Sequence, residues 1–568
     1  MGARSPGPPT MRRMTPLSRR GLLTAATAAT TALSATAVPA SAAPAAAAST
    51  AAPRTGRVSV AGLVRDRLHL PSGIMTGETG TDSVVIWSRS SGDGRMIVKV
   101  TSVDEDFNPA RGRARFETTV ASGWVTAQTD HTVKIGVTGL PDGSQFLYAV
   151  RFQDADGIDS PPEFGTFRTA PAGLHIGRRQ HGLRPSGTAQ SFVWTADTAG
   201  QGWGINADLG GMRTYRAMAA THPDFFIHAG DTIYADGPLE AEVQEPDGQL
   251  WRNLVTEGVS KVAETQEEFR ARHRYNLMDH NIRDFYASTS LYAQWDDHET
   301  TNNWWPGETI DDERYTVRDV DTLAQRGRRA WQEYQPIGDA RALKPGTSGF
   351  EDARIYRKIS RGSQLEIFCL DMRSFKGENT DGMEPHETDI LGEEQTQWLI
   401  DGLRDSRATW KCLSADLPFG LVVPDGDAQE SISNDEPGAP RGRELQLARV
   451  LKSIKDNDVK NVFVVTGDVH YCAAHHYTPE NASFQEFDEF WEFVAGPINA
   501  GAFGPNELDG TFGPEEVFVK AGPTGGSPRD ASGQFFGHVD LDEQDLMTVS
   551  LRDGDGVIVW EKEFEPRF

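Results

Sequence analysis

The sequence predicts a layered α/β domain preceded by a small β-sandwich. From Asp82 to Pro171, short β-type runs are separated by turn residues and show no helical period. Beyond residue 190, apolar runs alternate with longer amphipathic stretches such as 266–286 and 442–456, which is the pattern of strands covered by helices. Six of these apolar runs end in aspartate, and this repetition indicates a site at one edge of the sheet.

The composition is that of a globular and strongly acidic protein. Of the 568 residues, 24% are charged and 38% are hydrophobic, and 82 acidic side chains against 56 basic ones give a formal charge of −26. A surface this negative repels nucleic acid and anionic membranes, so we expect no nucleic-acid-binding domain. Three cysteines are too few for a disulfide scaffold. We also expect a monomer without a membrane span.

The first 42 residues have the layout of a twin-arginine signal peptide. Arg19-Arg20 precedes an uncharged, Ala/Thr-rich stretch that ends in the small residues Ala40-Ser41-Ala42. A membrane anchor, the alternative, needs about 20 strongly apolar residues and does not fit this composition. Residues 43–57, rich in Ala, Pro, Ser and Thr, indicate a tether. We therefore expect export by the twin-arginine machinery to a secreted, periplasmic or cell-wall location.

The β-rich segment 58–171 predicts a sandwich domain. Its runs, such as 96–103 and 145–154, have the spacing of a small sandwich. The stretch from Leu140 to Tyr148 resembles the fibronectin-type turn into a late strand. Because no cluster of His, Cys or acidic residues lies here, we expect a positioning module.

A basic, Gly-containing linker at 172–189 leads into the predicted α/β domain, residues 190–568. Near its end, the apolar runs 546–551 and 557–564 flank an Asp-Gly-Asp-Gly turn, which predicts a β-hairpin. Two long polar segments, of a length that is usually functional or disordered, interrupt the domain: 236–264 and 422–441.

The aspartates at the ends of the apolar runs predict a metal centre. They are Asp197, Asp231, the Asp296-Asp297 pair, Asp371, Asp416 and Asp468. In an open α/β sheet, the carboxyl ends of the strands form the edge where ligands bind. Carboxylates a few ångströms apart raise each other's pKa, so several at one edge require cations. Each aspartate alone is explained as a turn or a helix cap, and only the repetition favours metal binding.

Other donor types stand beside these aspartates. The donors, each one to three residues after an aspartate, are Tyr234, His298 and His470. A carboxylate can bridge two cations, a phenolate favours a trivalent hard ion, and imidazole binds several transition metals. Two cations about 3.5–4 Å apart clamp a phosphoryl group and activate a water between them.

Several short motifs together resemble a known family. They are Gly230-Asp-Thr-Ile-Tyr234, Trp295-Asp-Asp-His298 with the following Glu-Thr-Thr-Asn-Asn, Asp371-Met-Arg373, and Gly467-Asp-Val-His470. The chain resembles the PhoD-like secreted phosphatases of the calcineurin-like metallophosphoesterase superfamily, whose usual layout also includes a preceding sandwich and a twin-arginine signal. The resemblance implies a metallophosphoesterase-type layered α/β domain after a fibronectin-like sandwich. It also implies a metal-dependent alkaline phosphatase or phosphodiesterase.

The resemblance implies a first metal site around Asp231, which would be the bridging carboxylate. Asp197, Tyr234 and His470 would complete this site, which is ferric in the related purple acid phosphatases. Many relatives have a Ser-Cys-Gln triplet where this chain has Asp197, and a carboxylate in place of the thiolate makes the site harder. We expect Fe³⁺ or another transition metal, such as manganese, at this position.

The second implied site is built mainly from oxygens. Its candidate ligands are Asp231, Asp297, Asp468 and, as a fourth, Asp416. Such a shell prefers calcium, manganese or magnesium over zinc, in agreement with the calcium dependence associated with the family. We expect Ca²⁺ or Mn²⁺ there.

The expected reaction is in-line attack on phosphorus by a metal-activated hydroxide. Asp231 holds both metals, Arg373 and the cations hold the equatorial oxygens, and His298 donates a proton to the departing alkoxide. His298 as a residue that only orients a ligand, and Arg373 as a structural ion-pair partner, are the alternatives. Asn302 and Asn303 either line the site or cap the next segment.

Two rival functions stay open. A phosphodiesterase, for example a phospholipase D-like enzyme acting on a phospholipid head group or a teichoic-acid-like polymer, would use the same metals. A non-catalytic exported protein would use the acids as structural calcium sites, which need neither His298 nor Tyr234.

Overall fold

The computed structural model describes five stretches of the chain: 67–104, 106–112, 115–172, 189–343 and 354–568. The predicted signal peptide (1–42), the predicted tether (43–57) and most of the predicted linker (172–189) lie outside the described residues. Residues 67–104 and 109–568 form one unit, and the contacts discussed below lie within it.

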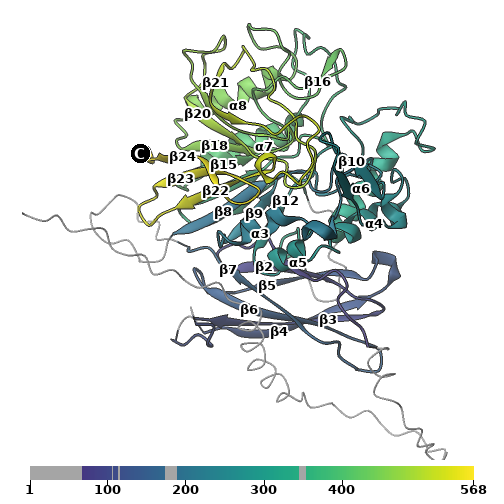
Figure 1. The fold of residues 1–568 in the computed structure, drawn as a ribbon. Helices are drawn as coiled ribbons and strands as arrows, with labels where there is room; N and C mark the ends of the chain where they lie inside the picture. Colours follow the sequence, from purple (N-terminus) through teal and green to yellow (C-terminus); the bar gives the residue numbers. More distant parts are fainter. Residues whose placement is uncertain (1–66, 105, 113–114, 173–188, 344–353) are drawn as a thin grey trace, which may run out of the picture. The chain divides into compact units, whose positions relative to one another are not determined.

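A nine-stranded sheet combines strands from the N-terminal β-rich segment, from residues 190–293 and from the C-terminal end of the chain (Figure 1). Its strand order is β24-β23-β22-β8-β9-β12-β1-β2-β5. The central strands β8, β9 and β12 are parallel, whereas β22, β23 and β24 extend the sheet by antiparallel pairs. The bounds are β8 Gln190–Thr195, β9 Phe225–His228, β12 Ser290–Ala293, β22 Phe535–Leu541, β23 Met547–Asp553 and β24 Ile558–Phe564.

A second sheet of seven strands has the order β13-β14-β15-β18-β20-β19-β21. Its central strands β14, β15, β18 and β20 are parallel. The bounds are β13 Arg357–Ser360, β14 Leu365–Cys369, β15 Trp410–Ser414, β18 Val462–Thr466, β19 Cys472–Tyr477, β20 Phe490–Val494 and β21 Pro514–Lys520. Parallel strands covered on both faces need apolar side chains on both faces, which explains the continuous apolar runs of the sequence.

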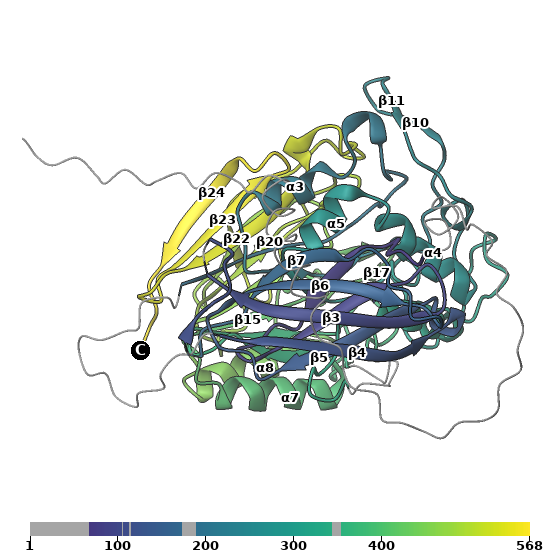
Figure 2. The same ribbon diagram turned by 90° about the horizontal axis from the view of Figure 1, so that it is seen from below.

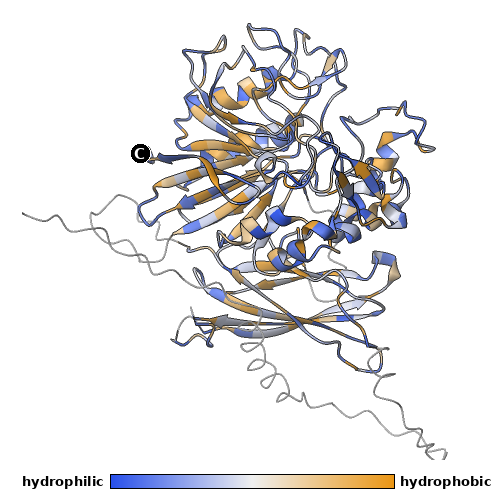
Figure 3. Ribbon diagram, viewed as in Figure 1, coloured by the Kyte–Doolittle hydropathy of each residue, from blue (hydrophilic) through white to orange (hydrophobic). Residues whose placement is uncertain are grey.

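The two sheets pack face to face, and helices cover their outer faces (Figure 1). In the view from below, α7 and α8 lie on one side of the molecule and α3 and α5 toward the other (Figure 2). Phe192 and Ile227 of the first sheet share a buried core with Ile367 and Phe463 of the second. The helices on the first sheet are α3 Arg213–Ala219, α4 Gln266–Asn276, α5 His280–Tyr286 and α6 Val320–Tyr334, and those on the second are α7 Gly392–Asp405 and α8 Glu444–Asp456. Hydrophobic residues are accordingly dense along the central strands (Figure 3).

The β-rich segment before residue 172 is a sandwich that shares a sheet with strands of residues 190–564. One layer is β4-β3-β6-β7, and the other consists of β1, β2 and β5. Because β1 pairs in parallel with β12, this second layer continues the nine-stranded sheet. The bounds are β1 Ile74–Gly77, β2 Ser83–Arg89, β3 Gly94–Val103, β4 Glu117–Val125, β5 Thr132–Thr138, β6 Gln145–Gln153 and β7 Glu163–Arg168.

Buried polar contacts also join the sandwich to the helices. Asp130, whose φ of 49° is left-handed, accepts hydrogen bonds from Arg89, Arg274 of α4 and Tyr334 of α6. The indole nitrogen of Trp87 donates to the carbonyl oxygen of Glu333 at 2.7 Å. Removing a carboxylate that accepts several hydrogen bonds in this way should lower the stability of the fold, because its donors would be left buried and without partners.

The expected α/β fold class is confirmed. The long polar segments hold two small hairpins: β10 Glu242–Gln244 with β11 Leu250–Arg252, and β16 Pro424–Asp425 with β17 Ala428–Gln429. Within the described part of the chain, no helix has both the length and the apolarity that a membrane crossing requires.

Candidate metal centre

The carboxyl ends of both sheets' parallel strands meet at one place. Gln294, directly after β12, donates from its amide nitrogen to the carbonyl oxygens of Leu370, after β14, and Ser414, at the end of β15. Beside it, the indole of Trp295 donates to Asp371 at 3.0 Å. The strand-end aspartates that the sequence singled out are therefore brought together from both sheets.

Several residues at these strand ends have a strained backbone. Asp197, Asp231, Asp468 and His470 all have positive φ angles, of 70°, 55°, 67° and 60°. Left-handed geometry costs an ordinary L-residue about 1–3 kcal/mol, and it persists only where the surroundings enforce it. Here it turns the chain sharply after the strand and directs each side chain into the cluster.

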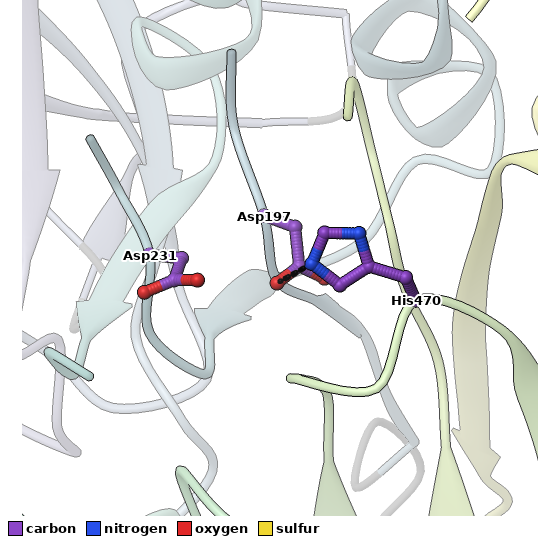
Figure 4. Close-up of side chains that lie close together, drawn as sticks. All are labelled: Asp197, Asp231 and His470. Atoms are coloured by element: carbon purple, nitrogen blue, oxygen red, sulfur yellow. Dashed lines mark ion pairs between the residues drawn. The ribbon is translucent and has the colours of Figure 1, made fainter. Parts of the chain in front are cut away.

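The first donor group consists of Asp197, Asp231 and His470, whose candidate ligand atoms lie within 4.8 Å of one another (Figure 4). His470 Nε2 lies 3.3 Å from Asp197 Oδ1 and 3.0 Å from the Tyr234 hydroxyl. The other ring nitrogen, Nδ1, bonds to the carbonyl oxygen of Gly501 at 2.5 Å. That bond places the proton on Nδ1 and leaves the lone pair of Nε2 for a cation.

Two further donor groups adjoin the first. One consists of Asp231, Asp297 and His298, and the other of Asp296, Asp297 and Asp468. Asp231 and Asp297 each belong to two groups, so the three groups form one continuous cluster. This sharing is the geometry that a carboxylate between two cations requires.

Unpartnered oxygens test whether these residues fit a metal. Asp197 Oδ2, Asp297 Oδ1 and Asp416 Oδ1 are buried and have no hydrogen-bond partner among the described residues. Buried carboxylate oxygens are normally paired, and cations are the partners that a cluster of acids lacks. Asp416 belongs to none of the three donor groups, and its Oδ2 accepts the backbone N–H of Met372 at 2.8 Å. The residues present fit bound cations.

Burial raises the pKa of four of the clustered carboxyls: Asp231, Asp296, Asp416 and Asp468. For Asp231, the charge of Asp297 adds to the burial. For Asp297 itself, burial acts in the same sense, but the charges of His298 and Arg373 outweigh it and lower the pKa. The folded, metal-free cluster thus binds protons that the unfolded chain releases, so its stability falls as the pH rises above the ordinary carboxyl range.

His298 lies at the edge of the cluster in a dyad with Asp236. Its Nδ1 is 2.8 Å from Asp236 Oδ1, and its ring stacks on that of Tyr234 with centroids 4.1 Å apart. Burial alone would lower the pKa of His298, but Asp236 and Asp297 raise it to about 10. The His298 side chain is 13% exposed, and its Nε2 lies 4.0 Å from Asp297 Oδ2.

Arg373 is enclosed by carboxylates. Its Nε donates to Asp296 Oδ1 at 2.5 Å, and its Nη1 pairs closely with Glu430, which also binds Lys376. The remaining nitrogen, Nη2, lies 3.9 Å from Asp297 Oδ1 and has no hydrogen-bond partner among the described residues. Of the two roles considered for Arg373, these contacts favour the ion-pair partner.

Four residues of the site were not singled out by the sequence: Asp236, Asp296 as a donor, Glu299 and Glu430. Asp296 and Glu299 lie within the Trp-Asp-Asp-His-Glu motif, and Asp236 follows Tyr234 by two residues, so their positions were the available signal. Glu430 belongs to the long polar segment 422–441 and gave no signal of its own. Asn303 donates its backbone N–H to Asp297 at 2.6 Å, whereas Asn302 is exposed.

Comparison with known families identifies the family to which the chain belongs. The family model described as PhoD-like phosphatase matches residues 192–550, and that of the PhoD-like phosphatase N-terminal domain matches residues 40–171. The chain belongs to the PhoD-like phosphatase family. The resemblance inferred from the motifs is confirmed, and so is the expectation of a phosphoric ester hydrolase.

Individual relatives support the assignment of this chain to the PhoD-like phosphatases. The chain is 26% identical over 448 residues to alkaline phosphatase D of Bacillus subtilis (strain 168), covering 77% of this chain and 70% of the relative. A solved structure of PhoD aligns with a TM-score of 0.61 at 20% identity, over 89% of this chain and 93% of the other. The structure of the purple acid phosphatase PPD1 of yellow lupin seeds aligns with a TM-score of 0.51 at 12% identity, over 86% of this chain and 73% of the other. These two structural likenesses establish the fold.

We expect the purified PhoD-like phosphatase to contain metal and to show a visible charge-transfer band if the first group holds Fe³⁺, because the Tyr234 hydroxyl adjoins its donors. Tyr234→Phe should abolish the band. Tyr292→Phe is the matched control, since its buried hydroxyl bonds instead to the carbonyl of Thr79. Elemental analysis measures the bound metals, and visible absorption spectroscopy detects the band. Bound manganese or zinc without a band would contradict iron at this position.

Proposed function

We propose that this PhoD-like phosphatase is an exported enzyme that hydrolyses phosphate esters at two adjacent cation sites sharing Asp231. The observation that carries the proposal is the membership of Asp231 in two donor groups, one containing the imidazole of His470 and the other that of His298. A phenol, an imidazole and carboxylates converging on one buried point exceed what a structural calcium site needs.

The two sites differ in their donors. We assign Asp197, Asp231, Tyr234 and His470 to the first, which suits Fe³⁺ or another transition metal. To the second we assign Asp231, Asp297 and Asp468, with Asp296 added because it shares a donor group with Asp297 and Asp468. This oxygen-rich shell suits Ca²⁺ or Mn²⁺. For Asp416, the bond to the Met372 backbone supports a positioning role behind the second site.

Bound cations at such a centre lower the pKa of water and neutralise charge on the phosphoryl group. The chain's own residues orient the reaction. Asp236 holds Nδ1 of His298, so the proton on Nε2 is the one available to the leaving oxygen. Tyr234 fixes the plane of the His298 ring by stacking. Arg373 keeps Asp296 in place and offers one unpaired nitrogen, Nη2, on the side of Asp297.

His298→Ala should lower kcat by about 10²–10⁴-fold for an alkyl phosphate, because the alkoxide then leaves without a proton donor. The loss should be much smaller for p-nitrophenyl phosphate, whose phenolate leaves readily. Metal content should be unchanged. His476→Ala, a histidine stacked on Trp491, is the control and should keep full activity. Equal losses on both substrates, or loss of metal, would refute the proton-donor role.

We expect kcat/KM for p-nitrophenyl phosphate to exceed that for bis(p-nitrophenyl) phosphate by at least about tenfold. A monoester dianion gains more from two cations than a diester monoanion does. The opposite ratio would make the chain a phosphodiesterase. If the protein hydrolyses neither substrate, both enzyme proposals are refuted.

Export is the remaining part of the proposal. Arg19-Arg20 and the Ala40-Ser41-Ala42 sequence support passage through the twin-arginine pathway and cleavage after Ala42. N-terminal sequencing of the extracytoplasmic protein should therefore read from Ala43. Replacing both arginines by lysine should leave uncleaved chain in the cytoplasm. Normal export of that variant, or an intact N-terminus outside the cytoplasm, would contradict this route.

A further inference from the structure

We propose that Glu299 is a positioning residue that sets the distance between the cation-binding loops following β9 and β12. The inference rests on the proposed function, because it assigns Glu299 to the geometry of the shared site. Glu299 is completely buried and follows His298 directly in the chain.

The carboxylate of Glu299 binds both loops at once. Its Oε1 accepts the backbone N–H and the hydroxyl of Thr232, each at 2.6 Å. Its Oε2 accepts the backbone N–H of Asp231 at 3.1 Å and that of Asp296 at 2.9 Å. Asp231 and Thr232 belong to the loop after β9, and Asp296 belongs to the loop after β12. One carboxylate therefore connects the two loops.

Strand pairing does not extend as far as these loops. The last paired residues of β9 and β12 are His228 and Ala293, and the next backbone bond runs from Gln294 N to His228 O. Asp231 and Asp297 lie beyond this point, yet both must reach the same cations. The Glu299 bonds to Asp231 N and Asp296 N act where the ladder has ended.

The hydrogen bonds of Glu299 indicate which role it plays. Each of its two carboxylate oxygens accepts two of the four bonds, so both oxygens are fully used as acceptors. Since both oxygens are already occupied by these donors, Glu299 orients ligands and is not itself one.

Glu299→Gln tests this role. The amide keeps one acceptor oxygen but presents an NH₂ group to N–H donors, so either the Thr232 contacts at Oε1 or the Asp231 and Asp296 contacts at Oε2 are lost. We expect the Mn²⁺ concentration for half-saturation, measured by equilibrium dialysis of the metal-depleted protein, to rise about 10–100-fold. At saturating Mn²⁺, KM for p-nitrophenyl phosphate should change less than about twofold while kcat stays reduced.

Glu444→Gln is the matched control. Glu444 is also completely buried and accepts backbone N–H groups, those of Asn434 and Arg441, but it contacts no cation-binding loop. It should lower the melting temperature without changing Mn²⁺ half-saturation. Should Glu299→Gln fail to fold, Thr232→Val removes the hydroxyl bond to Glu299 and a 3.4 Å bond from Gln335, keeps the backbone bond to Glu299, and should weaken Mn²⁺ binding by a few-fold.

The outcomes separate the two proposals. Wild-type Mn²⁺ binding in Glu299→Gln, or in a folded Thr232→Val if the first variant is not obtained, overturns the positioning role even if activity falls. A wild-type protein that binds no Mn²⁺, Ca²⁺ or Fe³⁺ overturns the proposed two-cation function instead. Equal weakening by Glu444→Gln would show a general stability effect and would also refute the specific role of Glu299.

Discussion

Repulsion among buried carboxylates is the constraint on which this structure depends. Asp197, Asp231, Asp297 and their neighbours are almost fully buried at a single point, where unbalanced negative charge is unfavourable. The protein supplies part of the balance through Arg373 and His298, each held in turn by a further acid. The unpartnered oxygens of Asp197 and Asp297 are what cations would satisfy.

The fold concentrates the charge by aligning two sheets. Because β8, β9 and β12 are parallel, and β14, β15 and β18 are parallel in the facing sheet, all six carboxyl ends reach the same place. Helices cover the outer faces, so the strands stay apolar and only their ends carry chemistry. Left-handed residues at the strand ends then turn the side chains inward, and this strain is maintained by the packed sheets behind them.

Beyond the last ladder bond, polar side chains take over the organisation of the centre. Glu299 holds the backbone of the two central loops, Asp236 orients His298, and Glu430 anchors Arg373. Each is buried and accepts more than one hydrogen bond, so its geometry is over-determined. The sandwich contributes rigidity to the same sheet through β1, which pairs with β12 next to the metal-binding loops.

The sequence by itself determined the fold class, the family and the aspartates at six strand ends, because strand periodicity and residues adjacent in the chain are local signals. It also placed Tyr234, His298 and His470 beside them. Tertiary structure alone decided which aspartates share a donor group, so that Asp296 joins the cluster and Asp416 turns toward the Met372 backbone. It also decided that Glu430, 57 residues after Arg373 in the chain, neutralises that arginine. These contacts join residues that are far apart in the sequence and meet only because the two sheets pack against each other. The periodicity of a single segment carries no information about them.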